Sequence, residues 1–383
     1  MKILSILKKI NKKVNILITT GIFPPDVGGP AKFVPLIADN LSKNHVLNVI
    51  TLSEETHNID EFNYRISRIR RKQNKLYRFL KTVILIIKEG RKVNIIFVNG
   101  LWLEVYVANL FLRKKTIRKI VGDPIWEKLY TKYRIDDNFD QFQQKKYTLK
   151  IELLKFLRNF TLKSNNTIVV PSKHLMDFVK NLGYKGRLLQ INNGTEITEN
   201  KKTNKDSYDF LIVSRLVRQK NIDLVLKSLS VVKEKYSVNF NLNIVGEGPE
   251  YKNIINLIEQ LKLKECVNLV GSKHGEELNQ FYKTSNYFLQ ISTYEGMPHS
   301  VLEAMNYGLT VIISNFGGNA ELLLNNKYGY LVDSFEVKEI AKTIYQALND
   351  AEKKFIEGKK LIESEFDIQE TIKNYTDLIL NNE

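Results

Sequence analysis

The chain has 383 residues, of which 43% are hydrophobic and 10% are aromatic, so packed cores are possible and a disordered protein is excluded. This length favours two domains over one. The single cysteine, Cys266, excludes an internal disulfide framework and fits a reducing cytoplasm, and the formal net charge is +16.

The charge is unevenly distributed along the chain. Residues 1–204 hold 38 Lys and Arg against 17 Asp and Glu, whereas residues 205–383 hold 20 against 25. A general enrichment in lysine would affect both halves alike, so we expect the first half to meet an anionic partner.

The sequence carries no signal for a membrane span or for export. The longest uninterrupted apolar run is residues 83–87, far shorter than a span, and the opening MKILSILKKINKK lacks the apolar stretch and cleavage site of a signal peptide. A cytoplasmic protein is therefore predicted.

Short apolar runs alternate with amphipathic stretches along the whole chain. In the first half we expect strands at Val14–Thr19, Val46–Leu52, Asn94–Val98, Ile117–Val121 and Thr167–Val170. In the second half we expect them at Asp209–Val213, Phe240–Val245, Val267–Val270, Tyr287–Ile291 and Thr310–Ile313. This rhythm predicts an α/β protein with two Rossmann-like, doubly wound domains that face each other across a cleft.

The domain boundary is expected in the polar segment Glu196–Asp206, which has no periodic apolar pattern. The expected division is a first domain at 1–200, a second at 201–365, and a C-terminal helix at 366–383 that packs back on the first domain.

The first chemical motif follows the first strand, in the stretch FPPDVGGPAKFV. Gly28 and Gly29 have no β-carbon, so their amides can approach a phosphate, and the helix expected from about Ala31 directs its positive end to the same place. An ordinary tight turn is the alternative. The spacing is not GxGxxG, which argues against an NAD-dependent dehydrogenase.

The second motif follows the first strand of the second half, in SRLVRQKN. Arg215 lies at the strand's C-terminal tip and Lys220 at the start of the next helix, where ligands bind in open α/β sheets. The two cations can hold a diphosphate from two sides. Two solvated basic residues on a loop are the alternative.

The strongest signal is YFLQISTYEGMPHSVLEAMNYGLTVIISNFGG, residues 287–318. Gly296 and Pro298 keep Glu295 on the loop, whereas Glu303 falls in the early turns of a helix over Ser300–Asn306. The amides from position 299 to 302 then form a helix N-terminus that can bind an anion. Glu303 suits the hydroxyls of a ribose and Glu295 those of a hexose. The alternative for Glu303 is a carboxylate that only interacts with the helix dipole.

With these motifs in place, the chain resembles the group 1 glycosyl transferases of glycosyltransferase family four, retaining enzymes with the GT-B double-Rossmann fold. The resemblance rests on EGMPHSVLEAMNYGLTVIIS with GGNAE, on SRLVRQKN, IVGEGPE and VNLVGSK, and more loosely on FPPDVGGPAKFV and INNG. It implies a transfer of a hexose-type sugar from a nucleotide diphosphate sugar to a saccharide or lipid-linked acceptor.

The resemblance also implies roles for residues. Glu295 would contact the donor sugar, Glu303 the ribose, and the cations the departing diphosphate, while the base would lie against residues 271–273. The expected donor-binding residues are Gly28, Gly29, Arg215, Lys220, Gly271, Ser272, Lys273, Gly296, Met297, Ser300, Val301, Leu302 and Glu303. No metal and no cofactor are expected, because these cations and helix-end amides can neutralise the diphosphate.

One position departs from the family's pattern. Many relatives carry a histidine after the fourth strand of the first domain, whereas this chain reads KIVGDPIWEKLY. We therefore expect Asp123 to take that place as a second catalytic residue, either bonding sugar hydroxyls or accepting the acceptor's proton. Its alternative role is an N-cap ahead of Pro124.

The basic first half suggests where the acceptor binds. Residues 65–81 hold eight Lys and Arg and no acid, and lead into a helical pattern that puts Leu76, Phe79, Leu80, Val83 and Ile87 on a shared apolar side. Further basic residues stand at Lys8, Lys9, Lys12, Lys13 and Arg113–Lys119. Such clusters can hold a protein on the anionic inner face of a membrane; a solvated basic face is the alternative.

Two other functions stay open. A phosphorylase or epimerase can use the same fold, because fold does not determine reaction. A nucleic-acid-binding protein would explain the basic half, but aromatic residues are not interleaved with the basic ones as in RNA-binding modules, so no nucleic acid partner is expected.

Overall fold

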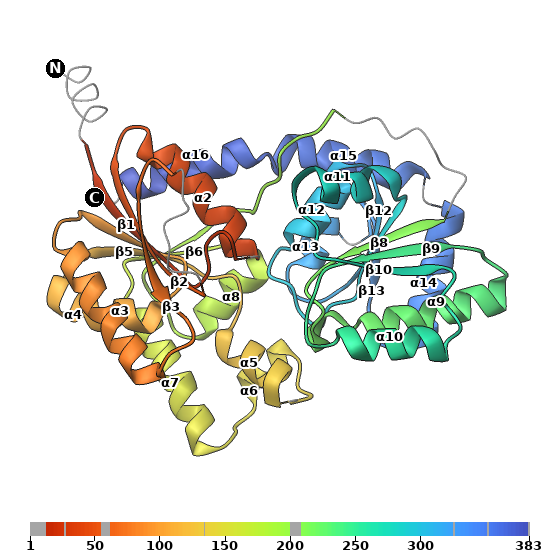
Figure 1. Ribbon diagram of the computed structural model, residues 1–383, viewed down its shortest axis with the longest axis horizontal. Coiled ribbons are helices and arrows are strands. Elements are labelled where there is room, and N and C mark those ends of the chain that lie inside the picture. Colours follow the sequence, from red (N-terminus) through yellow and green to blue (C-terminus); the bar gives the residue numbers. More distant parts are fainter. Residues whose placement is uncertain are drawn as a thin grey trace.

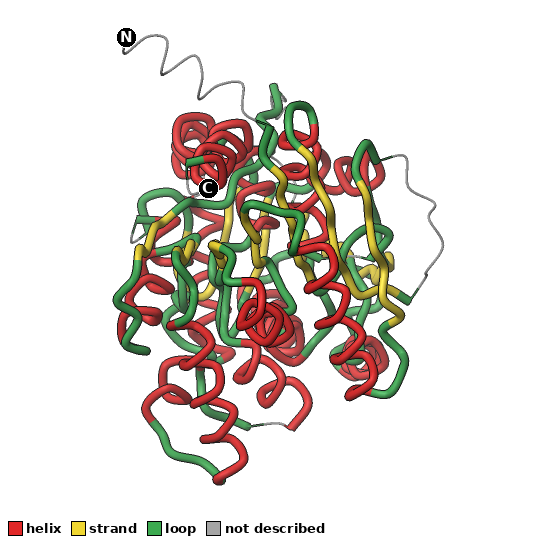
Figure 2. Tube along the Cα trace, turned by 90° about the vertical axis from the view of Figure 1, so that its left-hand side faces the viewer, coloured by secondary structure: helices red, strands yellow, loops and turns green. Residues whose placement is uncertain are grey.

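The computed structural model describes residues 13–26, 28–54, 62–133, 135–199, 208–324, 326–350 and 352–381. It contains two α/β domains, each built on a parallel sheet, lying side by side (Figure 1). The predicted fold class is therefore confirmed. Figure 2, which turns the N-terminal domain toward the viewer, shows strands between helices, as a buried parallel sheet requires.

The N-terminal sheet has seven strands in the order β3-β2-β1-β4-β5-β6-β7. The strands are β1 Asn15–Thr20, β2 Val46–Ser53, β3 Arg65–Arg70, β4 Ile95–Val98, β5 Lys115–Lys119, β6 Thr167–Val170 and β7 Arg187–Gln190. The helices are α2 Gly29–Ser42, α3 Lys75–Gly90, α4 Trp102–Leu112, α5 Pro124–Tyr133, α6 Phe139–Gln144, α7 Leu149–Lys163 and α8 Lys173–Asn181.

The C-terminal sheet has six strands in the order β10-β9-β8-β11-β12-β13. The strands are β8 Asp209–Val213, β9 Asn241–Val245, β10 Val267–Gly271, β11 Tyr287–Gln290, β12 Thr310–Ser314 and β13 Tyr330–Val332. The helices are the short 3-10 helix η1 Arg218–Lys220, α9 Ile222–Tyr236, α10 Tyr251–Gln260, α11 Gly275–Thr284, α12 His299–Asn306, α13 Asn319–Leu323, α14 Val337–Asp350, α15 Glu352–Glu365 and α16 Ile368–Leu380.

All ten strands expected from the sequence are present, with ends that differ by at most two residues, and three further strands were not predicted. The three are β3, β7 and β13, and each lies at the edge of its sheet. The three residues of β13 are too short a run to stand out, whereas half of the residues of β3 are arginines. The sequence RISRIR of β3 was therefore assigned to a basic segment, although Ile66 and Ile69 are buried.

The chain crosses between the domains at two places that lie against each other. Thr195 pairs with Asp367, and the amide of Ile368 donates to the Thr195 carbonyl at 3.0 Å. Beyond this point α16 lies along α2, as Figure 1 shows, and Tyr375 is buried in the core of the N-terminal domain.

The domains are also joined by an aromatic side chain. Tyr294, from the loop after β11, belongs to a core cluster that otherwise comes from the N-terminal domain. Its ring stacks on Phe139 at 3.9 Å between centroids and meets Trp126 edge-on at 5.7 Å. Because Tyr294 precedes Glu295, this contact determines where Glu295 lies relative to the N-terminal domain.

Candidate functional site

The glycine loop of the N-terminal domain faces the start of α12 in the other domain. Gly28 has φ +150°, in the region that favours glycine, and caps α2. A β-carbon on the exposed Gly29 would lie 3.9 Å from the ring of His299, the first residue of α12. Helix α2 begins at Gly29, two residues earlier than expected, so its N-terminus also points to the boundary between the two domains.

The start of α12 offers backbone groups rather than side chains. The side chains of Met297, Val301 and Leu302 are buried, so these residues can contact a ligand only through the backbone. The amide of Leu302 donates to the Pro298 carbonyl at 3.3 Å, which leaves positions 299 to 301 as the amides of the first turn. The expected anion-binding end is therefore one residue shorter than the sequence indicated.

Glu303 lies one turn further along α12 and connects the domains. One carboxylate oxygen forms an ion pair with Lys32 of α2, and the other accepts from the Tyr282 hydroxyl at 2.9 Å. Glu303 is thus more than a helix-dipole partner, because it is held by groups from two domains. Lys32, which the sequence analysis did not single out, is largely exposed and can move to a ligand.

Glu295 and Lys220 form an ion pair with each other. Both side chains are mostly buried, at 13% and 14% exposed. The loop that carries Glu295 is anchored at Gly318, whose amide donates to the Glu295 carbonyl at 2.8 Å. Arg215 is exposed at the end of β8. The structure therefore brings Lys220 to Glu295, a pairing that sequence spacing does not indicate.

A third carboxylate, that of Glu127 on α5, lies within electrostatic range of Arg215, Lys220 and Glu295. Burial raises the pKa of Glu127 to about 7, an effect that Arg215 opposes. A β-carbon at Gly122 would lie 2.6 Å from its Oε1 atom, so glycine at 122 leaves room for the carboxylate. Glu127 falls in the stretch KIVGDPIWEKLY and was not predicted to act at the site, because no local pattern shows that α5 faces the other domain.

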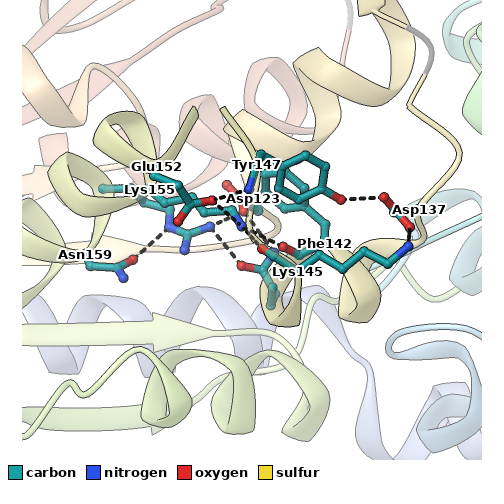
Figure 3. A network of polar contacts seen from close by, with 10 residues as sticks. Asp123, Asp137, Phe142, Lys145, Tyr147, Glu152, Lys155 and Asn159 are labelled. Atoms are coloured by element: carbon teal, nitrogen blue, oxygen red, sulfur yellow. Dashed lines mark hydrogen bonds and ion pairs between the residues drawn. The ribbon is translucent and has the colours of Figure 1, made fainter. Parts of the chain in front are cut away.

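For Asp123 the sequence left two roles open, a catalytic residue or the N-cap of the following helix. Its side chain is 0% exposed. One carboxylate oxygen accepts from the Ile125 amide at 3.0 Å, as an N-cap does; the other pairs with Arg158 and accepts from Gln143 Nε2 at 3.0 Å. Figure 3 shows Asp123 within a network of polar contacts. The capping role is thus the one observed. With both oxygens engaged inside the domain, Asp123 presents no free face to an acceptor.

The loop after β10 carries the residues expected to meet the base. Gly271 has φ +73° and its carbonyl accepts from the Gly246 amide at 2.8 Å. Ser272 donates its amide to Glu247 at 3.4 Å, and Lys273 pairs with Glu277 at 3.6 Å. These contacts all lie within the C-terminal domain, and the role of the loop in binding a base stays a prediction.

Two basic groups, the buried Lys119 and the partly buried His299, were not predicted to act through their side chains at the site. Lys119 lies 3.3 Å above the ring of Phe33 and donates to Asn193, and burial lowers the pKa of Lys119 to about 7. Burial lowers the pKa of His299 to about 3, with Lys119 and Lys32 adding to the effect. The imidazole of His299 is therefore neutral, and the neighbouring Lys119 and Lys32 favour an anion near the start of α12.

Residues 194–361 match the family model described as Glycosyl transferases group 1. This match supports the resemblance found in the sequence for the C-terminal domain. Over 198 residues the chain is 30% identical to the capsular polysaccharide biosynthesis glycosyltransferase CapH of Staphylococcus aureus, an alignment that covers 50% of this chain and 53% of CapH. The chain spans about half the length of the curated relatives it matches.

Solved structures match nearly the whole chain. Sucrose-phosphate synthase from Thermosynechococcus elongatus superposes with a TM-score of 0.79 at 19% identity, over 96% of this chain and 98% of that one. Anabaena Alr3699/HepE in complex with UDP and glucose superposes with a TM-score of 0.76 at 16% identity, over 96% and 100%. At such low sequence identities the superpositions establish the fold alone, and it is the predicted GT-B architecture.

Proposed function

We propose that this protein is a glycosyltransferase that moves a hexose-type sugar from a nucleotide diphosphate sugar to a saccharide or lipid-linked acceptor. The observation that carries the proposal is the meeting of three parts at the domain boundary. These are the glycine loop before α2, the first turn of α12, and the Lys220–Glu295 pair with Arg215 nearby. The match of residues 194–361 to the group 1 model supports it.

In this proposal the donor's diphosphate lies between Arg215, Lys220 and the amides of α12, with Gly28 and Gly29 approaching from the other domain. Cations and helix-end amides stabilise an anion, and they do so most as the diphosphate departs, which lowers the barrier. Metal-independent transfer is part of the proposal, because these groups supply the compensating charge.

The two glutamates hold the sugars on either side of the diphosphate. Glu303 accepts from the ribose hydroxyls, for which Lys32 must move aside or turn to the phosphates. Glu295 contacts the hexose, and its pair with Lys220 keeps a carboxylate and a cation at the bond that breaks. The base lies against Gly271, Ser272 and Lys273. Retention of the anomeric configuration is proposed from the resemblance of the chain to family four.

The product we propose is a cell-surface polysaccharide or glycolipid, assembled on the cytoplasmic side of a membrane. CapH is named for capsular polysaccharide biosynthesis, which supports this assignment. Within the described ranges, none of the helices has both the length and the apolarity of a membrane span. A lipid-linked acceptor would then be met by a protein that binds at the membrane surface.

A thermal-shift titration with UDP and UDP-glucose tests the donor site. A ligand at a hundredfold excess over its dissociation constant stabilises a protein by about 2.7 kcal/mol. Arg215→Ala and Lys220→Ala should abolish the shift given by UDP, whereas Lys252→Ala, an exposed lysine of the same domain, should leave it unchanged. Glu295→Gln should keep the UDP shift and lose turnover. If all variants behave like the parent with every nucleotide sugar tried, the assigned site is wrong.

Product analysis separates transfer from the other reactions open to this fold. Incubation with a nucleotide sugar and a saccharide acceptor should give a new glycoside and free nucleoside diphosphate. Release of a sugar phosphate, or an isomerised nucleotide sugar without transfer, would instead identify a phosphorylase or an epimerase.

A further inference from the structure

Three neighbouring helices of the N-terminal domain expose apolar side chains. On α7 the exposed residues Leu149, Leu153, Phe156 and Phe160 recur at helical spacing, and Leu149 is 90% exposed. On α3 and α4 the exposed apolar residues are Leu76, Tyr77, Leu80, Ile84, Leu110 and Phe111. Isolated exposed apolar residues are ordinary, but stripes on adjacent helices mark an interaction surface.

The helices that carry these side chains lie next to each other, and an aromatic contact joins two of them. Helices α3 and α4 pack together, and α4 contacts α7. The ring of Tyr106 on α4 meets Phe160 edge-on at 5.6 Å, and Phe160 stacks on Phe156. A hollow lined by Trp102 and Leu110, among others, lies between α4 and α7. In Figure 1 the three helices lie at the lower left, away from the C-terminal domain.

The surface is basic as well as apolar. Among the residues of these three helices, the exposed cations are Lys75, Lys81, Lys88, Lys150 and Lys163. The three acids are withdrawn: Glu89 is buried, and Glu104 and Glu152 are partly buried. Apolar stripes flanked by lysines, with the acids of the same helices at least partly buried, fit a lipid surface with anionic headgroups.

The sequence pointed to this half of the chain but not to this surface. Leu76 and Leu80, expected on a shared apolar side with Val83, are exposed, and only Val83 is buried. Two of the expected basic residues, Arg118 and Lys119, are buried and so cannot meet a membrane. Lys8, Lys9 and Lys12 lie outside the described residues. The exposed apolar residues therefore identify the docking surface, which the distribution of charge along the sequence did not.

We propose that α3, α4 and α7 dock the N-terminal domain on an anionic lipid bilayer, with the apolar residues entering the headgroup region and the lysines contacting phosphates. The inference does not rest on the proposed reaction, since binding to lipid needs neither donor nor acceptor. It deepens the proposed function by placing the acceptor-binding domain at the surface where a lipid-linked saccharide would be.

Flotation of the full chain with vesicles tests the proposal. The protein should float with vesicles of equal phosphatidylglycerol and phosphatidylcholine, and far less with phosphatidylcholine alone. Leu153→Ser with Phe156→Ser should weaken binding about tenfold or more at any salt concentration, because two apolar side chains no longer enter the bilayer. The matched control is Tyr251→Ser with Ile356→Ser, two exposed apolar residues of the C-terminal domain, which should bind like the parent.

The charge component is tested separately. Lys75→Gln with Lys81→Gln should weaken binding about thirtyfold at low salt, at roughly 1 kcal/mol per cation, and reduce the salt dependence. Lys252→Gln with Lys338→Gln is the control. The proposal is overturned if the parent does not float with anionic vesicles, or if all variants float equally. It is also overturned if sedimentation shows a dimer that the Leu153 and Phe156 changes dissociate. A normal UDP shift in each variant separates these outcomes from failure of the proposed function.

Discussion

Asp123→Asn distinguishes a structural carboxylate from a catalytic one. Asparagine keeps the shape of the side chain and can still cap α5, so the change removes only the negative charge. That charge pairs with Arg158 and interacts electrostatically with Arg118, and both of these guanidinium groups are buried. Burial, together with the positive charge of Arg158, lowers the pKa of Arg118 to about 10, whereas Asp123 raises it. Without the charge of Asp123 both cations stay buried, and Arg158 keeps only the weaker effect of Glu152.

Removing one partner of a buried ion pair costs about 3–5 kcal/mol. For a domain of this size each kcal/mol lowers the melting temperature by roughly 2–4 °C, so a fall of roughly 10 °C is expected. The assay is thermal unfolding of Asp123→Asn, Arg158→Met and the double variant. The double variant should be more stable than the sum of the two single losses predicts, because it leaves one fewer buried charge. If Asp123→Asn melts like the parent while turnover collapses, Asp123 acts in the chemistry and the structural account fails.

Three further predictions follow from the domain boundary. The pKa of Glu127 in the folded protein, about 7, exceeds its ordinary value of 4.5, so the parent should lose stability as the pH rises between these values. Glu127→Gln should therefore melt at a higher temperature than the parent at about pH 8 but not at about pH 5. An equal difference at both pH values would contradict this. Tyr294→Ala should weaken the docking of the two domains by about 3–5 kcal/mol and split the calorimetric transition in two. Tyr294→Phe should be at least as stable as the parent, since the buried hydroxyl has no hydrogen-bond partner within the described chain. A single unchanged transition in Tyr294→Ala would count against the docking role. A β-carbon at Gly296 would lie 2.4 Å from a carbonyl oxygen of the other domain, so Gly296→Ala should lower kcat/KM by about a hundredfold. Gly21→Ala is the control, because a β-carbon there would meet open space, and it should leave kcat/KM unchanged. Equal kinetics for both variants would refute the close approach at Gly296.

Much of the architecture was predictable because the interior strands of parallel sheets are buried on both faces. Such strands read as short apolar runs, which is why β1, β8 and β12 were found close to their true ends. The start of α12 was predictable for a similar local reason, since Pro298 and the apolar spacing after it favour a helix there. The edge strand β3 was missed because half of its residues are arginines and it pairs on one side only.

The sequence by itself determined the interior strands, the glycine loop before α2 and the start of α12, because each depends on residues that are neighbours in the chain. Only the tertiary structure decided that Asp123 lies inside its domain with Arg158, that Glu127 faces the other domain, and that Lys32 pairs with Glu303. These pairings join residues 35 and 271 positions apart in two of the cases, so no local periodicity encodes them. The packing of whole domains determines whether such a charge is buried, paired or free to bind a ligand.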